Sequence, residues 1–308
     1  MSQSAAQAAE PPDAYDIRDI APLVGCSLIW GSTWFAITFQ LGHVPAAVSV
    51  AYRFGLAALI LFAWLIVSRR SIRLSRAQHL ATFVQGALTF GVNYVFVYFA
   101  EERLPSAVVA VLFAGLAFAN LALFRLVYRV RAPRAAWIGA LLGVAGVGVL
   151  FVGELLRTHL DQRALAGLGC GLVAVVFAAL GNLAARRAQE LRIDVGANTA
   201  WAMAYGAAVL ALGAVATGQP WRFDATPAYV GSLLYLALFG SVVAFLFYFS
   251  LARRRGYVLA SYISAVTPVI AMLLSTLFEH AHWGFEALGG LGLVILGQVL
   301  LARAPKGA

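Results

Sequence analysis

Charged residues are scarce in this chain. Only 11% of its 308 residues are Asp, Glu, Lys or Arg, whereas 62% are apolar, and the mean hydropathy is +0.85. So little polar surface cannot cover a water-soluble globule of this length. The composition therefore excludes a soluble globular protein and predicts an integral membrane protein.

Cysteines and catalytic motifs are also sparse. The two cysteines, Cys26 and Cys170, lie inside apolar segments, so neither a disulfide framework nor a structural zinc site is expected. The phosphate-binding pattern G-x-x-x-x-G-K-S/T is absent, and the sequence offers no metal-ligand cluster or nucleophile with a base. We therefore expect no enzymatic activity, no metal and no cofactor.

Long apolar segments fill nearly the whole chain. A bilayer core is about 30 Å thick, which about 20 helical residues cross. The segments are apolar on every face, unlike the alternating strands of a membrane β-barrel, so the sequence predicts an all-α fold. The ten predicted spans are 20–41, 46–67, 80–100, 106–127, 135–153, 165–185, 195–217, 229–251, 257–278 and 283–302.

Arginine alternates between successive loops. Seventeen of the 22 Lys and Arg residues fall in or next to the two termini and every second loop, four fall in the other loops, and Arg53 alone lies well inside a span. By the positive-inside rule, this bias predicts cytoplasmic N- and C-termini in a bacterial inner membrane. The basic residues form no continuous patch, so nucleic acid is not an expected partner. Acids such as Glu101 are expected in the loops of the opposite side.

The chain repeats short patterns at a nearly constant offset. Gly25 to Leu28 is echoed 144 residues later, and Gly139 and Gly146 are echoed 151 residues later by Gly290 and Gly297. Each half would hold five spans, an odd number, so the second copy would insert upside down, as in many secondary transporters. We predict cytoplasmic tails at 1–19 and 303–308, and two inverted five-helix repeats at 20–153 and 165–302 around a central cavity.

Aromatic and polar side chains share helix faces in several spans. Residues three or four apart lie on the same face of a helix, and such faces suit the stacking of a ring in a cavity. Helix packing and interfacial aromatic belts are the competing explanations. The candidate substrate-binding residues on such faces are Trp30 and Trp34, Asn93, Tyr94 and Tyr98, Trp201 and Tyr205, and Tyr248.

Two further features point to a cavity. Arg53 would stand about 12 Å beyond Pro45 inside its span, at a cost of roughly 2.5–3.5 kcal/mol. It either holds a substrate carboxylate or bonds backbone carbonyls and joins helices. Near Ser264 and Thr267, Pro268 frees helix carbonyls, which bind a ligand or merely bend the helix.

These residues resemble a known family. A Trp30-Gly31-Ser32 start to the first span, the Arg53–Phe54 pair, Thr267–Pro268, Glu279 and a glycine-rich last helix are similar to the EamA family of the drug/metabolite transporter superfamily, and most resemble its YddG-type aromatic amino acid exporters. The resemblance covers nearly the whole chain. It implies ten helices in two halves, a central substrate cavity, and fifth and tenth helices at the periphery.

The function expected from the sequence is export of amino acids, aromatic and other neutral ones, from the cytoplasm by alternating access. Export of other small metabolites or drugs is the alternative among transporters, and a membrane scaffold is the alternative outside them. No Asp, Glu or His is expected near mid-membrane, so facilitated transport without an obligatory proton is predicted. The expected partners are the substrate and the lipid bilayer, with the chain a monomer or a homodimer.

Overall fold

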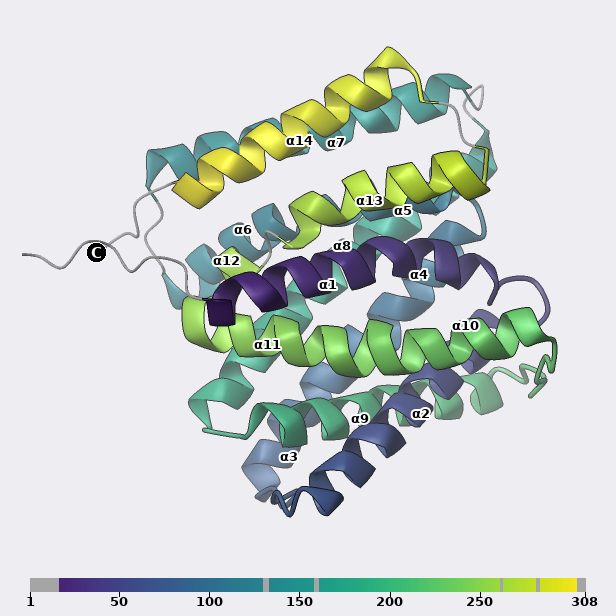
Figure 1. The fold of residues 1–308 in the computed structure, drawn as a ribbon, viewed down its shortest axis with the longest axis vertical. Coiled ribbons are helices and arrows are strands. Elements are labelled where there is room, and N and C mark those ends of the chain that lie inside the picture. The colour runs from purple at the N-terminus through teal and green to yellow at the C-terminus, as the bar shows by residue number, and fades with distance from the viewer. Residues whose placement is uncertain (1–16, 130–132, 158–160, 261–262, 281–282, 304–308) are drawn as a thin grey trace, which may run out of the picture.

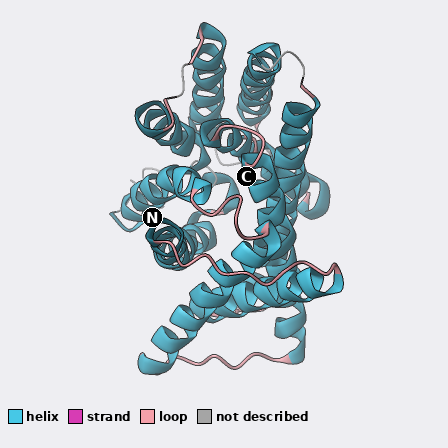
Figure 2. Cartoon of the chain, turned by 90° about the vertical axis from the view of Figure 1, so that its right-hand side faces the viewer, coloured by secondary structure: helices cyan, strands magenta, loops and turns pink. Residues whose placement is uncertain are grey.

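The computed structural model describes residues 17–129, 133–157, 161–260, 263–280 and 283–303, and these contain helices and loops but no strand (Figure 2). Most of both predicted tails, 1–16 and 304–308, lies outside the described residues. The helices are α1 (Ile17–Thr38), α2 (Ala46–Val67), α3 (Arg76–Gly86), α4 (Asn93–Glu101), α5 (Ser106–Ala114), α6 (Leu116–Tyr128), α7 (Arg134–Arg157), α8 (Gln162–Glu190), α9 (Val195–Ala216), α10 (Pro227–Ala237), α11 (Ala244–Arg255), α12 (Tyr257–Ala260), α13 (Ile263–Phe278) and α14 (Phe285–Arg303).

Seven helical stretches of the described chain are long and apolar enough to cross a bilayer. They are Asp19–Thr38, Ala46–Val67, Arg76–Glu101, Ser106–Tyr128, Gln162–Glu190, Val195–Ala216 and Pro227–Arg255. Three more apolar stretches, Arg134–Leu150, Val266–Phe278 and Phe285–Gly297, are shorter. The all-helical membrane architecture is thus confirmed, whereas the count of ten spans stays a prediction.

Two of the long stretches contain a π-helical turn. The segment η1 (Ala87–Val92) joins α3 to α4, and η2 (Leu238–Val243) joins α10 to α11. Their bounds differ by 151 residues, the offset that also relates the glycine pairs. A π turn closes hydrogen bonds five residues apart instead of four, which alters the local pairing of backbone carbonyls.

Polar residues at the loop ends fix where several helices begin. Ser75 accepts a hydrogen bond from the backbone of Gln78, whose side chain in turn accepts one from the backbone of Ser75, a capping box at the start of α3. Asp194 caps α9 through the backbone of Ala197. These caps satisfy amides that would otherwise be unpaired at the membrane boundary.

Helices α7 and α14 pack against each other along one side of the bundle (Figure 1). A Cβ on Gly146 would lie 2.5 Å from the carbonyl oxygen of Gly290, and a Cβ on Gly297 would meet the carbonyl oxygen of Gly139. Because the later residue of one helix faces the earlier residue of the other, the two helices are antiparallel. Glycine lets their backbones approach this closely.

The two ends of the described chain lie on the same side of the bundle, where α1 begins and α14 ends (Figure 1). The same end is tied together by an ion pair between elements far apart in sequence. Both Nε and Nη2 of Arg255 donate to Oδ2 of Asp19, at 2.9 and 2.7 Å, and Arg254 lies 3.3 Å from Oδ1. This contact holds the start of α1 against the end of α11.

Candidate functional site

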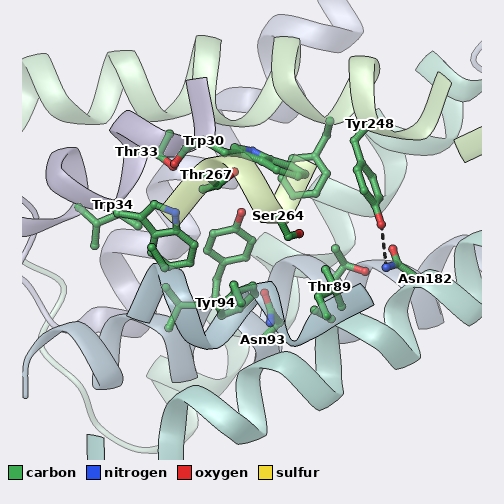
Figure 3. A pocket seen from close by; sticks show the side chains of 17 residues that line it. Trp30, Thr33, Trp34, Thr89, Asn93, Tyr94, Asn182, Tyr248, Ser264 and Thr267 are labelled. Carbon is green, nitrogen blue, oxygen red and sulfur yellow. Dashed lines mark hydrogen bonds between the residues drawn. The ribbon is translucent and has the colours of Figure 1, made fainter. Parts of the chain in front are cut away.

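A cavity opens between the two halves of the chain, bounded by α1, η1, α4, α5, α6, α8, α11 and α13 (Figure 3). It holds about 700 Å³ of empty space, including the part open to solvent. Its walls combine aromatic rings with hydroxyl and amide groups. The lining residues are Trp30, Thr33, Trp34, Ile37, Thr89, Asn93, Tyr94, Val97, Ala110, Phe113, Leu116, Ala178, Asn182, Phe245, Tyr248, Ser264 and Thr267.

Aromatic contacts fix the walls of this cavity. The ring of Trp30 packs edge-on against Phe245 with centroids 5.0 Å apart, and lies 5.3 Å from Tyr248. The ring of Trp34 lies 5.1 Å from that of Phe113. Such edge-to-face and tilted pairs hold the rings in defined orientations. The cavity therefore presents preformed aromatic faces to a ligand.

Polar side chains that line the cavity are held by hydrogen bonds to neighbouring helices. Nδ2 of Asn182 donates to the hydroxyl of Tyr248 at 2.9 Å, drawn as the dashed line in Figure 3, and to Oδ1 of Asn120 at 3.2 Å. Nδ2 of Asn93 donates to the carbonyl of Ala174 at 2.5 Å. The hydroxyl of Thr89 is buried and has no hydrogen-bond partner among the described residues. A buried group of this kind is available to a ligand or a water molecule.

The π-helical segment η2 supports the site from the second half of the chain. The carbonyl of Gly240 accepts hydrogen bonds from Nε1 of Trp30 at 3.2 Å and from Nη2 of Arg53 at 3.5 Å. Helix interiors normally use their carbonyls for their own ladder, so a carbonyl that accepts two side chains marks the altered pairing of the π turn. Helices α1 and α2 are thereby held to η2.

Arg53 lies behind the cavity wall rather than in it. Its side chain is 1% exposed, and its Nε donates to Oγ of Ser241 at 3.0 Å. The guanidinium carbon lies 4.7 Å from the ring centroid of Tyr94, which itself lines the cavity. Arg53 therefore makes the contacts of a residue that joins helices, to a hydroxyl and a backbone carbonyl of η2, and not those of a residue in the cavity wall.

The cavity unites seven of the twelve candidate residues. Tyr98 and Pro268 are buried near it without lining it. The seven lining candidates are Trp30, Trp34, Asn93, Tyr94, Tyr248, Ser264 and Thr267.

Trp201 and Tyr205 on α9 are not brought to the cavity. Nε1 of Trp201 donates to the carbonyl of Ile72 at 2.8 Å, and the hydroxyl of Tyr205 lies 2.8 Å from Nδ1 of His79. Their partners belong to the loop between α2 and α3 and to the start of α3. The helical spacing correctly placed both rings on one face, which packs against these elements instead.

Several lining residues lay outside the sequence candidates. Phe245 shares a helix face with Tyr248, three residues away, so the spacing was a usable signal. Asn182 joins helices through its bonds to Asn120 and Tyr248, and it also lines the cavity. Thr89 and Phe113 have no spacing pattern that distinguishes them from packing residues.

One acidic residue differs from its expected place. Glu101 was expected in a loop, but it is the last residue of α4 and only 6% exposed. Neither of its carboxylate oxygens has a hydrogen-bond partner among the described residues. Helix α4 ends one residue beyond the predicted span 80–100, and this last residue is packed inside the bundle rather than placed in the loop.

Comparison with known proteins agrees with this architecture. The model of the EamA-like transporter family matches the chain twice, over residues 20–152 and 165–303. The chain is 29% identical to the uncharacterized inner membrane transporter YedA of Escherichia coli K12, over 92% of this chain and 90% of the relative. It is 24% identical to the uncharacterized transporter YoaV of Bacillus subtilis, over 91% and 95%, and 26% identical to protein PecM of Dickeya dadantii, over 92% and 91%.

A solved crystal structure shares the fold. It superposes with a TM-score of 0.71 over 94% of this chain and 99% of the other, at 19% identity. The two matches of the family model cover most of the chain and include every helix that lines the cavity. The chain therefore belongs to the EamA-like transporter family and is a membrane transporter.

Proposed function

We propose that this transporter exports neutral amino acids, aromatic ones among them, from the cytoplasm by alternating access through the cavity. The observation that carries the proposal is the lining itself. Among the described residues, no Asp, Glu, Lys, Arg or His lines the cavity, whereas aromatic rings and anchored amides and hydroxyls do. This chemistry suits a substrate without net charge that has an apolar or aromatic side chain and a polar end.

The lining argues against strongly charged substrates. A phosphate or nucleotide is held by cationic side chains, usually arginine forks, and none of the described residues that line the cavity is cationic. Arg53 lies behind the ring of Tyr94, with its Nε on Ser241. Export of other neutral metabolites or drugs remains the alternative. The resemblance to YddG-type exporters supports the amino acid assignment.

Alternating access is supported by the repetition within the chain. The family model matches two stretches of similar length, and the π turns η1 and η2 stand 151 residues apart. The antiparallel contact of α7 with α14 pairs Gly146 with Gly290 and Gly139 with Gly297, as a two-fold relation between inverted repeats requires. Two such halves can pack in two ways, each opening the cavity to one side.

The direction of threading rests on charge. The side on which α1 begins and α14 ends also carries the arginine-rich loops, so it is the cytoplasmic side under the positive-inside rule. The relative YedA is named an inner membrane transporter, which fits a multi-pass protein of that membrane. A scaffold would not need a polar and aromatic cavity between two repeated halves.

The test is substrate competition in proteoliposomes. Counterflow of labelled phenylalanine is measured against excess phenylalanine, tryptophan, threonine and a lipophilic cation. The proposal expects competition by the amino acids, whereas competition by the cation alone would replace it with drug export. No flux of any amino acid would refute it.

A matched pair of variants assigns the flux to the cavity. Tyr94→Ala removes a ring of the wall and is expected to lower flux about tenfold, the effect of losing a contact worth about 1.4 kcal/mol. Trp137→Ala removes a ring from the outside of α7, where Trp137 is 39% exposed, and is expected to leave flux unchanged. Both variants are compared at equal amounts of folded protein in the membrane.

A further inference from the structure

Glu101 occupies the end of the helix that lines the cavity. On α4, Tyr94 and Val97 line the cavity, and Glu101 follows Val97 by one helical turn. On α5, Ala110 lines it, and Ser106 precedes Ala110 by one turn. The hydroxyl of Ser106 donates to Oε2 of Glu279 at 2.8 Å. Helices that line the cavity thus meet beyond it in a polar cluster, in which Glu101 and Ser106 are buried and Glu279 is half-buried.

The cluster lies at the end opposite to the arginine-rich side. Glu279 directly follows α13, which ends on the side of the bundle opposite to the start of α1 (Figure 1). Helix α13 lines the cavity through Ser264 and Thr267. Helix α5 packs against α13, so opening the cavity at this end would part α5 from the end of α13 and break the Ser106–Glu279 bond. The structure contains both the Ser106–Glu279 bond and a buried Glu101.

The neighbours of Glu101 provide no contact cation. Arg53 on α2 and Glu279 after α13 are the charged groups that act on it most, with opposite signs. Arg53 contacts Ser241 and the ring of Tyr94, and its Nη1 has no hydrogen-bond partner among the described residues, so it forms no ion pair with Glu101 there. Helices α1 and α5 and the segment η1 bring no ionisable side chain to this end within the described chain.

The remaining charges nearby are engaged elsewhere. Nη1 of Arg103 lies 3.2 Å from Glu102 and donates to the carbonyl of Phe99. From the start of α8, Nη2 of Arg163 donates to the backbone carbonyl of Glu102 at 2.7 Å. One turn before Glu101, the hydroxyl of Tyr98 is fully buried and also has no partner among the described residues. An ionised Glu101 would therefore be a buried charge without a contact.

We propose that Glu101 is a proton-binding site that holds the outer end of the transport path closed. A buried carboxylate without a partner is strongly unfavourable, and a second carboxylate nearby adds repulsion, whereas a neutral carboxyl group removes both terms. In the closed state, Glu101 takes up one proton from the outer solution to form a carboxyl group. When the end opens, water reaches the group and the proton returns to the same solution.

This site gates transport without driving it. Because the proton enters and leaves on one side, no proton crosses the membrane with the substrate, so facilitated export is preserved. Acidification of the outer solution favours the closed outer end, and neutral or alkaline conditions release it. The inference rests on the proposed function only for the identity of this end as the outer one.

The test measures the opening of this end directly and uses no substrate. Spin labels are attached to Arg103→Cys and His280→Cys after Cys26→Ala and Cys170→Ala, and the label-to-label distance is measured in nanodiscs between pH 5 and pH 8. A single titrating carboxyl changes its ionised-to-neutral ratio about tenfold per pH unit, so the closed-to-open ratio should follow a curve of that steepness.

Three variants discriminate the proton site from a general pH effect. Glu101→Gln, which is neutral at every pH, should stay in the short-distance state throughout. Glu279→Gln removes the repelling carboxylate, so the midpoint of the transition should move to lower pH. Glu286→Gln removes an exposed carboxylate and should match the parent.

The proposal is overturned if the labelled parent shows no pH-dependent distance, or if Glu101→Gln responds to pH as the parent does. Failure of the substrate assignment would look different. In that case no amino acid would exchange in proteoliposomes, yet the distance would still titrate and the Glu101→Gln variant would still abolish the titration.

Discussion

Burial of Arg53 is balanced by a small set of contacts, and that balance predicts how its variants behave. A charge at this depth costs roughly 2.5–3.5 kcal/mol. The hydrogen bond from Nε to Ser241 at 3.0 Å contributes about 1.5–3 kcal/mol of stabilisation. The contact of the guanidinium with the Tyr94 ring at 4.7 Å contributes about 1–2 kcal/mol. Because Nη1 is buried without a partner among the described residues, these contacts do no more than offset the cost of burying the charge. Removing the Ser241 hydroxyl should therefore lower the stability of the fold more than removing the positive charge of Arg53.

We accordingly expect Ser241→Ala to lower the free energy of unfolding by about 1.5–3 kcal/mol, and Arg53→Met, of similar length, by less than about 1 kcal/mol. In the double variant, Ser241→Ala should add little, because its partner is already gone. Unfolding is followed by circular dichroism during titration of dodecyl sulfate into mixed micelles. A matched control is Ser27→Ala, since the buried Ser27 hydroxyl donates to the carbonyl of Leu23 on its own helix and, among the described residues, to no other helix.

Two results would contradict this balance: a larger destabilisation by Arg53→Met than by Ser241→Ala, or additive effects of the two substitutions in the double variant. Either result would mean that the positive charge stabilises the fold beyond the contacts described above. Flux then separates structure from transport. If Arg53→Met folds normally but loses flux, the field of Arg53 acts on the substrate through Tyr94.

Two further predictions concern the ends of the molecule. Gly297→Ala places a methyl group against the carbonyl oxygen of Gly139 and should lower the free energy of unfolding by about 1–3 kcal/mol. Gly292→Ala, whose methyl group meets open space, should be neutral or slightly stabilising. Thermal unfolding in detergent compares the two variants, and equal melting temperatures would contradict the close contact of α7 with α14. Asp19→Asn removes the carboxylate to which Arg255 donates two hydrogen bonds. Because Arg255 is partly exposed, we expect the free energy of unfolding to fall by about 1–3 kcal/mol, measured by dodecyl sulfate unfolding. An unchanged midpoint would show that other contacts hold this end.

The sequence predicted the helices well because lipid leaves few choices. Every backbone amide within the bilayer must pair internally, so a long apolar run becomes a helix and its length is set by the membrane. The predicted span 46–67 coincides with α2, and the predicted span 106–127 is one residue shorter than the stretch from α5 to α6. The π turns η1 and η2 were not predicted, because no residue type specifies them.

The sequence predicted cavity residues only where aromatic and polar side chains recur on one face of a helix. Trp30 and Trp34, four residues apart, and Asn93 with Tyr94 reach the cavity as expected. The same rule misplaced Trp201 as a cavity residue, because periodicity identifies an inward face without saying which neighbour it meets. Choosing among inward faces requires the packing angles of all the helices, and these depend on contacts far apart in sequence.

The two π turns show how repeated backbones acquire different roles. At the offset of 151 residues, Thr89 in η1 corresponds to Gly240 in η2. Thr89 lines the cavity with a buried hydroxyl that has no partner in the described chain, whereas the carbonyl of Gly240 anchors Trp30 and Arg53. A side chain larger than glycine at position 240 would meet Arg53 and Thr33, so this role excludes a threonine there. The π turn η1 thus presents a hydroxyl group to the cavity, while the π turn η2 fixes the side chains of Trp30 and Arg53. The cavity is therefore chemically asymmetric although the chain around it repeats.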